Sequence, residues 1–110
     1  APIGVDAVYA KTLPGGDGTG VKIIDIENFW NETHEDLEKA LGATIGQGNS
    51  QDGDHGTAVI GEMIGGDNEY GVTGICPGAD IGMVSTAYNS IASAIIKALW
   101  VGTLKPARSA

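Results

Sequence analysis

Basic side chains are scarce in this sequence. Six lysines and arginines stand against 14 aspartates and glutamates, which gives a net charge of −8. No basic cluster interrupts this balance, so the composition argues against a nucleic-acid partner, and an anionic membrane surface would repel the chain. No run of 18 apolar residues occurs, so no segment is suited to span a membrane. We therefore expect contacts with neither nucleic acid nor membrane.

Cysteine is represented by Cys76 alone. A single cysteine excludes an internal disulfide framework and any metal site built on a CxxC motif. The residue lies in the apolar segment GICPGA, where a thiol typically serves as a small buried hydrophobe.

Glycine and apolar residues, by contrast, are plentiful. Hydrophobic residues make up 42% of the 110 positions, which is enough for one core in a single small domain. The 18 glycines are about twice the usual share of roughly 7%. They fall between the periodic segments, which indicates tight turns and close approaches of the backbone.

The apolar periodicity predicts an α/β fold with a short parallel sheet. Residues 21–26 are apolar except for Lys22 and Asp25, a composition that favours a strand covered on both faces. The other expected elements are strands at 43–45 and 81–84 and helices at 3–13, 55–64 and 90–100. Asp54 ends the polar loop 46–54 and stands in the place of a helix N-cap. The tail from residue 101 shows no periodicity. The alternation of helices and strands is typical of a parallel sheet.

Asp25 and His55 are the candidate catalytic residues. Asp25 ends an apolar strand, and open α/β sheets hold their ligand sites at the carboxyl ends of their strands. His55 opens a helix, where the helix dipole disfavours the imidazolium and a nearby carboxylate would offset that effect. An aspartate and a histidine at one sheet edge are two members of an acyl-transfer triad. The plain structural alternative is a strand-end cap for Asp25 and a helix-start cap for His55.

Other polar segments give weaker indications. A small metal-binding domain would use Asp25, His34 and His55, although the spacing around His34 is not that of an HExxH zinc site. The turn at residues 67–69, Asp-Asn-Glu, offers the oxygen ligands that calcium prefers. The glycine-rich GDGTG precedes a strand, whereas phosphate-binding loops follow one, so we exclude a nucleotide site there.

Several segments, in this order, resemble the subtilisin-like serine proteases, the subtilases. GTGVKIIDIE is similar to the aspartate block of the family and places Asp25 at the catalytic aspartate. The downstream HEDL is similar to its His-Pro-Asp-Leu turn, and DHGTAVIGEMIGG to its histidine block, with His55 as general base. GVTGICPGADIGMVS is similar to the connection into the next strand. The resemblance covers roughly residues 4–100.

The sequence departs from the family in its aspartate block, in its histidine block and in two blocks that it lacks. Ile26 and Glu27 replace the hydroxyl residue and the glycine that usually follow the catalytic aspartate, and Ala58 replaces a second histidine. The nucleophile block Gly-Thr-Ser-Met-Ala and the block with the oxyanion asparagine are absent. The serines that are present, at positions 50, 85, 90, 93 and 109, lie in no such context.

The resemblance implies that residues 1–110 are the N-terminal portion of a subtilisin-like peptidase domain, with a partial three-layer fold. It implies a serine endopeptidase that acts on polypeptides, inactive as this chain alone, with Asp25 and His55 awaiting a serine from another segment. The expected partner is therefore the rest of the catalytic domain or another copy. No cofactor is required, calcium is an option, and secretion is usual in the family although this chain shows no signal peptide. The alternative is an inactive relative that serves as a binding or assembly module.

Overall fold

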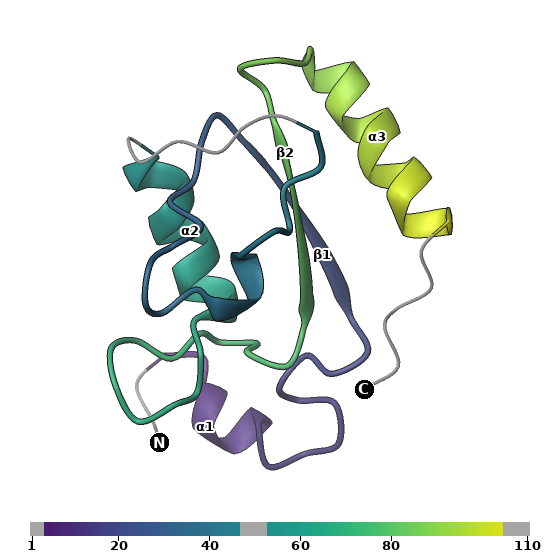
Figure 1. The fold of residues 1–110 in the computed structure, drawn as a ribbon. Helices are drawn as coiled ribbons and strands as arrows, with labels where there is room; N and C mark the ends of the chain where they lie inside the picture. Colours follow the sequence, from purple (N-terminus) through teal and green to yellow (C-terminus); the bar gives the residue numbers. More distant parts are fainter. Residues whose placement is uncertain (1–3, 47–52, 105–110) are drawn as a thin grey trace.

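The computed structural model describes residues 4–46 and 53–104. The elements, in chain order, are α1 (Ala7–Ala10), β1 (Lys22–Glu27), the 3-10 helix η1 (Glu38–Ala40), α2 (Asp54–Ile64), β2 (Asp80–Ser85) and α3 (Ile91–Leu104). Figure 1 shows the two strands in the middle, with α2 and α3 on opposite sides. The expected α/β class and the parallel sheet flanked by helices are confirmed.

The sheet brings the ends of β1 and β2 together. The two strands pair in parallel from Lys22 opposite Asp80 to Glu27 opposite Ser85. The expected strand at 43–45 is reduced to one parallel bridge between Thr44 and Met83. Two backbone hydrogen bonds of Met83 hold that segment, one from Ile45 N at 2.7 Å and one to Ala43 O at 3.1 Å. β2 therefore lies between β1 and this short segment.

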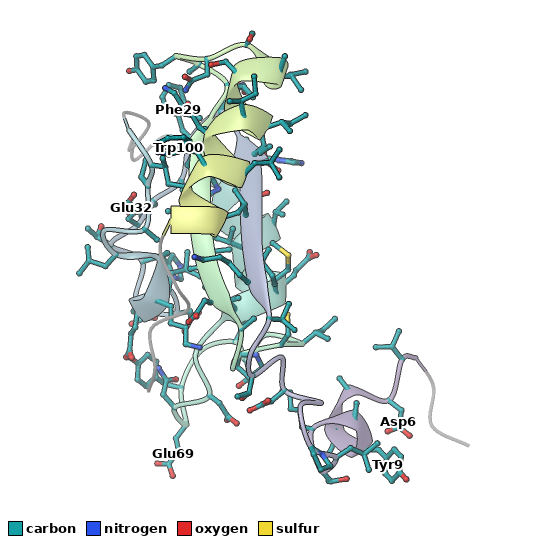
Figure 2. All side chains as sticks on the ribbon, turned by 90° about the vertical axis from the view of Figure 1, so that its right-hand side faces the viewer. Asp6, Tyr9, Phe29, Glu32, Glu69 and Trp100 are labelled. Atoms are coloured by element: carbon teal, nitrogen blue, oxygen red, sulfur yellow. The ribbon has the colours of Figure 1, made fainter. Side chains whose placement is uncertain are left out.

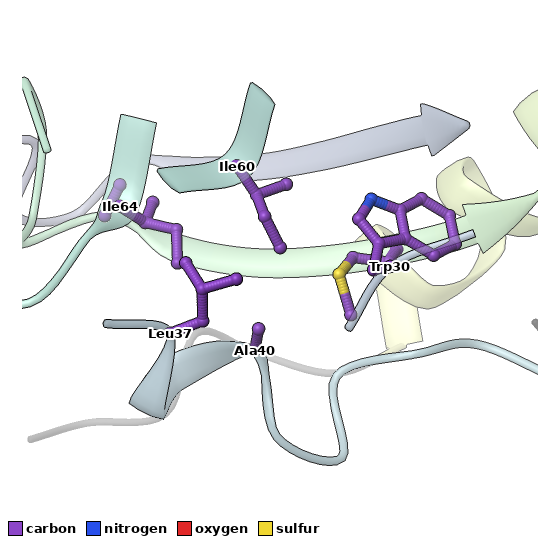
Figure 3. Packing of buried hydrophobic residues seen from close by; sticks show 7 residues of the cluster. Trp30, Leu37, Ala40, Ile60 and Ile64 are labelled. Atoms are coloured by element: carbon purple, nitrogen blue, oxygen red, sulfur yellow. The ribbon is translucent and has the colours of Figure 1, made fainter. Parts of the chain in front are cut away.

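The core fills the space between β2, α2 and η1. Figure 3 shows Ile60 and Ile64 of α2 above Leu37 and Ala40, with Trp30 at one end of the cluster. These five side chains are at most 1% exposed. Ala79 and Met83 complete the buried cluster, and Ile23 of β1 packs against it. The core-facing side of β1 is thus the side of its odd-numbered residues, because side chains alternate along a strand.

Both terminal helices differ from the expectation. The helix expected at 3–13 is confined to α1, and its apolar side chains Val5, Val8 and Tyr9 are at least 61% exposed. Figure 2 shows Tyr9 on a segment that stands away from the sheet. The aperiodic tail is expected from residue 101, but the helix α3 continues to Leu104. Residue 3, most of the loop 46–54 and residues 105–110 lie outside the described residues.

α3 packs against both strands on the face opposite α2. Its outer surface is rich in apolar side chains that are exposed, namely Ile91, Ile95, Ile96, Leu99 and Trp100. Within the part of the chain that the structure describes, no helix combines the length and the hydropathy needed to cross a membrane.

Candidate active site

The end of β1 presents two carboxylates on one face. Asp25 and Glu27 are two residues apart, so both lie on the side of the sheet that faces α2. The main chain here is held by β2: Thr86 N donates to Glu27 O at 2.8 Å, and the Ser85 hydroxyl donates to Asn28 O at 2.5 Å. The carboxylates therefore project from a fixed backbone.

The start of α2 lies directly against the chain that leaves β1. A Cβ atom at Gly53 or Gly56 would collide with the backbone of Phe29, so glycine is required for this approach. The Thr57 hydroxyl donates to Gly53 O at 2.6 Å and accepts from Asn31 N at 2.8 Å. These bonds join the first turn of α2 to the segment after β1.

The helix start differs in one detail from the sequence-based prediction. The N-cap is Gly53, and Asp54, predicted as the cap, is the first helical residue. Asp54 instead supplies a negative charge to the first turn, where the helix dipole favours it. His55 follows in that same turn.

His55 forms its side-chain hydrogen bond with Glu27. The Nδ1 atom lies 2.7 Å from Oε2 of Glu27. An ionised carboxylate can only accept, so a hydrogen bond to one requires the imidazole proton on Nδ1, and the neutral ring then carries its lone pair on Nε2. The Glu27 side chain is 19% exposed and that of His55 is 83% exposed, so the imidazole is open to an incoming group.

Asp25 is held by a different donor. Its Oδ2 accepts a hydrogen bond from Nε1 of Trp30 at 2.7 Å. Partial burial raises the pKa of Asp25 above the ordinary value of 3.8, the Trp30 bond opposes this rise, and the charge of Glu27 adds to it. The sequence pointed to Asp25 as the carboxylate beside His55, whereas the structure gives the hydrogen bond to Glu27. Glu27 could have been found from its place on the same strand face, one pleat beyond Asp25.

The described serines are not placed as nucleophiles. Ser85, opposite Glu27 in the sheet, is fully buried and commits its proton to Asn28 O. Ser90 and Ser93 lie at the start of α3, where the Ser90 hydroxyl accepts from Ser93 N at 3.1 Å. Ser50 and Ser109 lie outside the described residues. Among the described residues, the site therefore contains the imidazole of His55 and the carboxylates of Asp25 and Glu27, but no serine placed as a nucleophile.

A metal centre on Asp25, His34 and His55 has no support. His34 Nδ1 accepts a bond from Asp36 N at 3.2 Å within its own turn. Nowhere in ranges 4–46 and 53–104 do three or more histidine, cysteine, aspartate or glutamate side chains gather as metal ligands.

A pair of oxygens near the turn at residues 67–69 lacks hydrogen-bond donors. Asp36 Oδ1 and Asn68 Oδ1 are both buried with no hydrogen-bond partner. Gly71 lies so close that a Cβ there would collide with the Asp36 carboxylate. Gly66 N donates to Asp36 O at 2.9 Å, so the residues on both sides of the turn, Gly66 and Gly71, lie against Asp36. Oxygens of this kind fit a hard cation such as calcium.

Comparison with known proteins identifies the family. The model of the subtilase family matches residues 17–100, which include β1, α2, β2 and most of α3. No curated protein and no solved structure matched the chain. Because the match extends over most of the sequence, the chain belongs to the subtilase family.

Proposed function

We propose that this chain supplies the acid–base half of a subtilisin-like serine endopeptidase, with His55 as the general base. The observation that carries the proposal is the bond between His55 Nδ1 and a carboxylate at the carboxyl end of β1. A triad needs this arrangement, because the carboxylate fixes the tautomer and stabilises the imidazolium that forms. The His55 side chain is 83% exposed, which leaves room for a serine and a polypeptide substrate.

The reaction assigns two proton transfers to His55. Nε2 takes the proton of the serine hydroxyl as the oxygen attacks the scissile carbonyl, and returns it to the leaving amine. The sequence-based hypothesis gives the orienting role to Asp25, two residues from the carboxylate that His55 contacts. Without a nucleophile neither role produces turnover, so we expect no peptidase activity from the chain alone.

The proposed partner is a segment that carries the serine block, in a longer polypeptide or as a separate chain. Within the described residues, β1 pairs on one edge only, with β2. Such an edge is a template for another strand. The exposed side chains of Ile91 and Ile96 on α3 give an apolar surface next to the sheet that an added segment would bury. A second copy of the chain is the competing occupant.

Calcium and secretion complete the proposal. Asp36 and Asn68 would hold a calcium ion through the two oxygens that lack donors, and the ion would stiffen the turn after α2. We also propose that the protein is secreted, as subtilases usually are. Neither feature enters the chemistry at His55.

The test joins the chain to a serine-bearing segment and measures labelling of the serine by a fluorophosphonate. The segment comes from a longer parent polypeptide or from the serine-containing part of another subtilase. We expect labelling and peptide hydrolysis, and a loss of about 10⁶-fold in kcat on His55→Ala. His34→Gln, at the other histidine, is the control and should leave both unchanged. An assembled complex that folds but never labels would favour the inactive binding module, and turnover by the chain alone that disappears on His55→Ala would contradict the need for a partner.

A further inference from the structure

The carboxylate beside His55 is not the one that the family pattern indicates. Asp25 occupies the position matched to the catalytic aspartate, yet the imidazole contacts Glu27 at 2.7 Å. Glu27 is the last residue of β1 and has the longer side chain of the two. Its extra methylene lets a carboxylate reach past the strand end to the first turn of α2.

Glu27 is well placed for this task. Its carbonyl accepts from Thr86 N at 2.8 Å, which fixes the backbone from which the side chain leaves. The side chain is largely buried, at 19% exposure, whereas the imidazole is open. A largely buried carboxylate that accepts a hydrogen bond from Nδ1 favours one tautomer of the ring. In that tautomer, Nε2 carries the lone pair that a general base needs.

Asp25 has another contact. Its Oδ2 receives the indole N–H of the fully buried Trp30 at 2.7 Å. The indole in turn belongs to the core cluster under α2, so this bond ties the carboxylate to the core. Partial burial raises the pKa of Asp25, and the bond from Trp30 opposes this rise.

We propose that Glu27 is the positioning residue that orients His55, and that Asp25 with Trp30 forms the support behind it. This inference rests on the proposed function and goes beyond it, because it moves the acid of the triad one pleat along β1. Glu27, which departs from the family pattern, then acquires a role. Compared with the family pattern, the orienting carboxylate then comes from a longer side chain two residues further along β1, while the histidine stays at the start of α2.

The experiment records the tautomer of His55 in the 110-residue chain by ¹⁵N NMR of the imidazole nitrogens. His34→Gln assigns the two histidines. We expect the Nδ1–H form to dominate, and Glu27→Ala to reduce its ratio to the Nε2–H form by about two- to fivefold, the range of an exposed ion pair. Glu27→Gln, which keeps an acceptor oxygen, should restore part of the ratio and serves if the alanine variant fails to fold. Asp25→Asn removes the charge of the neighbouring carboxylate and should lower the ratio less than Glu27→Gln does. Glu62→Gln, at an exposed carboxylate of α2, is the charge-matched control and should leave the ratio unchanged.

The outcomes separate the two proposals. A ratio that falls on Asp25→Asn and not on the Glu27 variants returns the orienting role to Asp25 and overturns the inference while leaving the peptidase assignment intact. A ratio that no variant moves, or that both positions move equally, overturns it as well. Loss of the peptidase assignment would show instead in the labelling experiment, through an assembled complex that stays unlabelled whatever the tautomer of His55.

Discussion

The indole of Trp30 donates its N–H to Oδ2 of Asp25 at 2.7 Å, and so ties a half-buried carboxylate to a fully buried aromatic ring. Trp30 lies in the core cluster, and Asp25 lies on the strand face that carries Glu27. The bond therefore connects the stability of the core with the charge at the strand end.

Trp30→Phe should destabilise the chain by about 2–4 kcal/mol at neutral pH, because it removes a bond to a charged group and leaves a void in the core. Urea denaturation measures the change. The Trp30 bond lowers the pKa of Asp25, so its removal costs less where the carboxyl is already protonated. In the double variant with Asp25→Asn, the additional cost of Trp30→Phe should shrink. A cost that is equal at acid and neutral pH would show that the bond contributes nothing.

Asp25→Asn should change the pH dependence of stability. The folded-state pKa of Asp25 is raised, so folding favours its protonated form, and the stability tied to it falls as pH rises from below 3.8 through the folded-state pKa. The variant lacks this loss. Relative to the parent chain, its free energy of unfolding should be higher at neutral pH than in acid. Denaturation curves across this pH range test the sign, and an opposite trend would contradict the burial of Asp25.

Gly56→Ala and Gly61→Ala should have opposite effects although both lie in α2. A methyl group at Gly56 would enter the Phe29 carbonyl and the Trp30 ring, and we expect a loss of about 1–3 kcal/mol. At Gly61 the nearest atom outside the helix is Leu37 Cδ2 at 3.9 Å, an ordinary contact. Alanine there should gain about 0.5–1 kcal/mol from helix propensity. Thermal unfolding of the pair provides the measurement, and two equal losses would show that α2 does not approach the chain through Gly56.

Thr57→Val should loosen the start of α2. The hydroxyl makes two hydrogen bonds, to Gly53 O and from Asn31 N, and their loss should cost about 1–2 kcal/mol. Amide hydrogen exchange at residues 54–57 should accelerate, since the first turn would be less firmly joined to the strand end. Thr57→Ser keeps the hydroxyl and is the matched control. Equal exchange in the valine and serine variants would contradict the role of these bonds.

Calcium should raise the melting temperature of the chain, and Asp36→Asn should reduce the rise. Binding to the folded state alone stabilises by about 2.7 kcal/mol when the ion is at 100 times its dissociation constant. Asp6→Asn removes the same charge next to α1 and should respond as the parent does. Thermal unfolding with calcium or with a chelator decides between these outcomes. No shift with calcium would leave the Asp36 and Asn68 oxygens unexplained by a cation.

Much of the fold is visible in the sequence because periodicity reports burial. The run at β1, the helix from His55 and the strand at β2 all carry apolar residues where the core needs them. The segment at 43–45 looks like a strand for the same reason, but only Thr44 pairs with β2. α1 is shorter than its pattern because the apolar residues around it find no core to cover.

The candidate site is only partly visible in the sequence. A motif can place Asp25 and His55 at one sheet edge, but it cannot decide which of two carboxylates on the same face reaches the imidazole. That choice depends on side-chain length and on the competing donor Trp30, five residues further on. Likewise, the buried oxygens of Asp36 and Asn68 come from segments far apart in the chain, and no local pattern joins them.

The close backbone contact between Gly53, Gly56 and Phe29 has a consequence for how such a sequence can evolve. The location of the histidine depends on these main-chain atoms and on the Thr57 hydroxyl, and not on the carboxylates at the end of β1. Substitutions at Asp25 or Glu27 can therefore change which carboxylate reaches the imidazole without moving the start of α2.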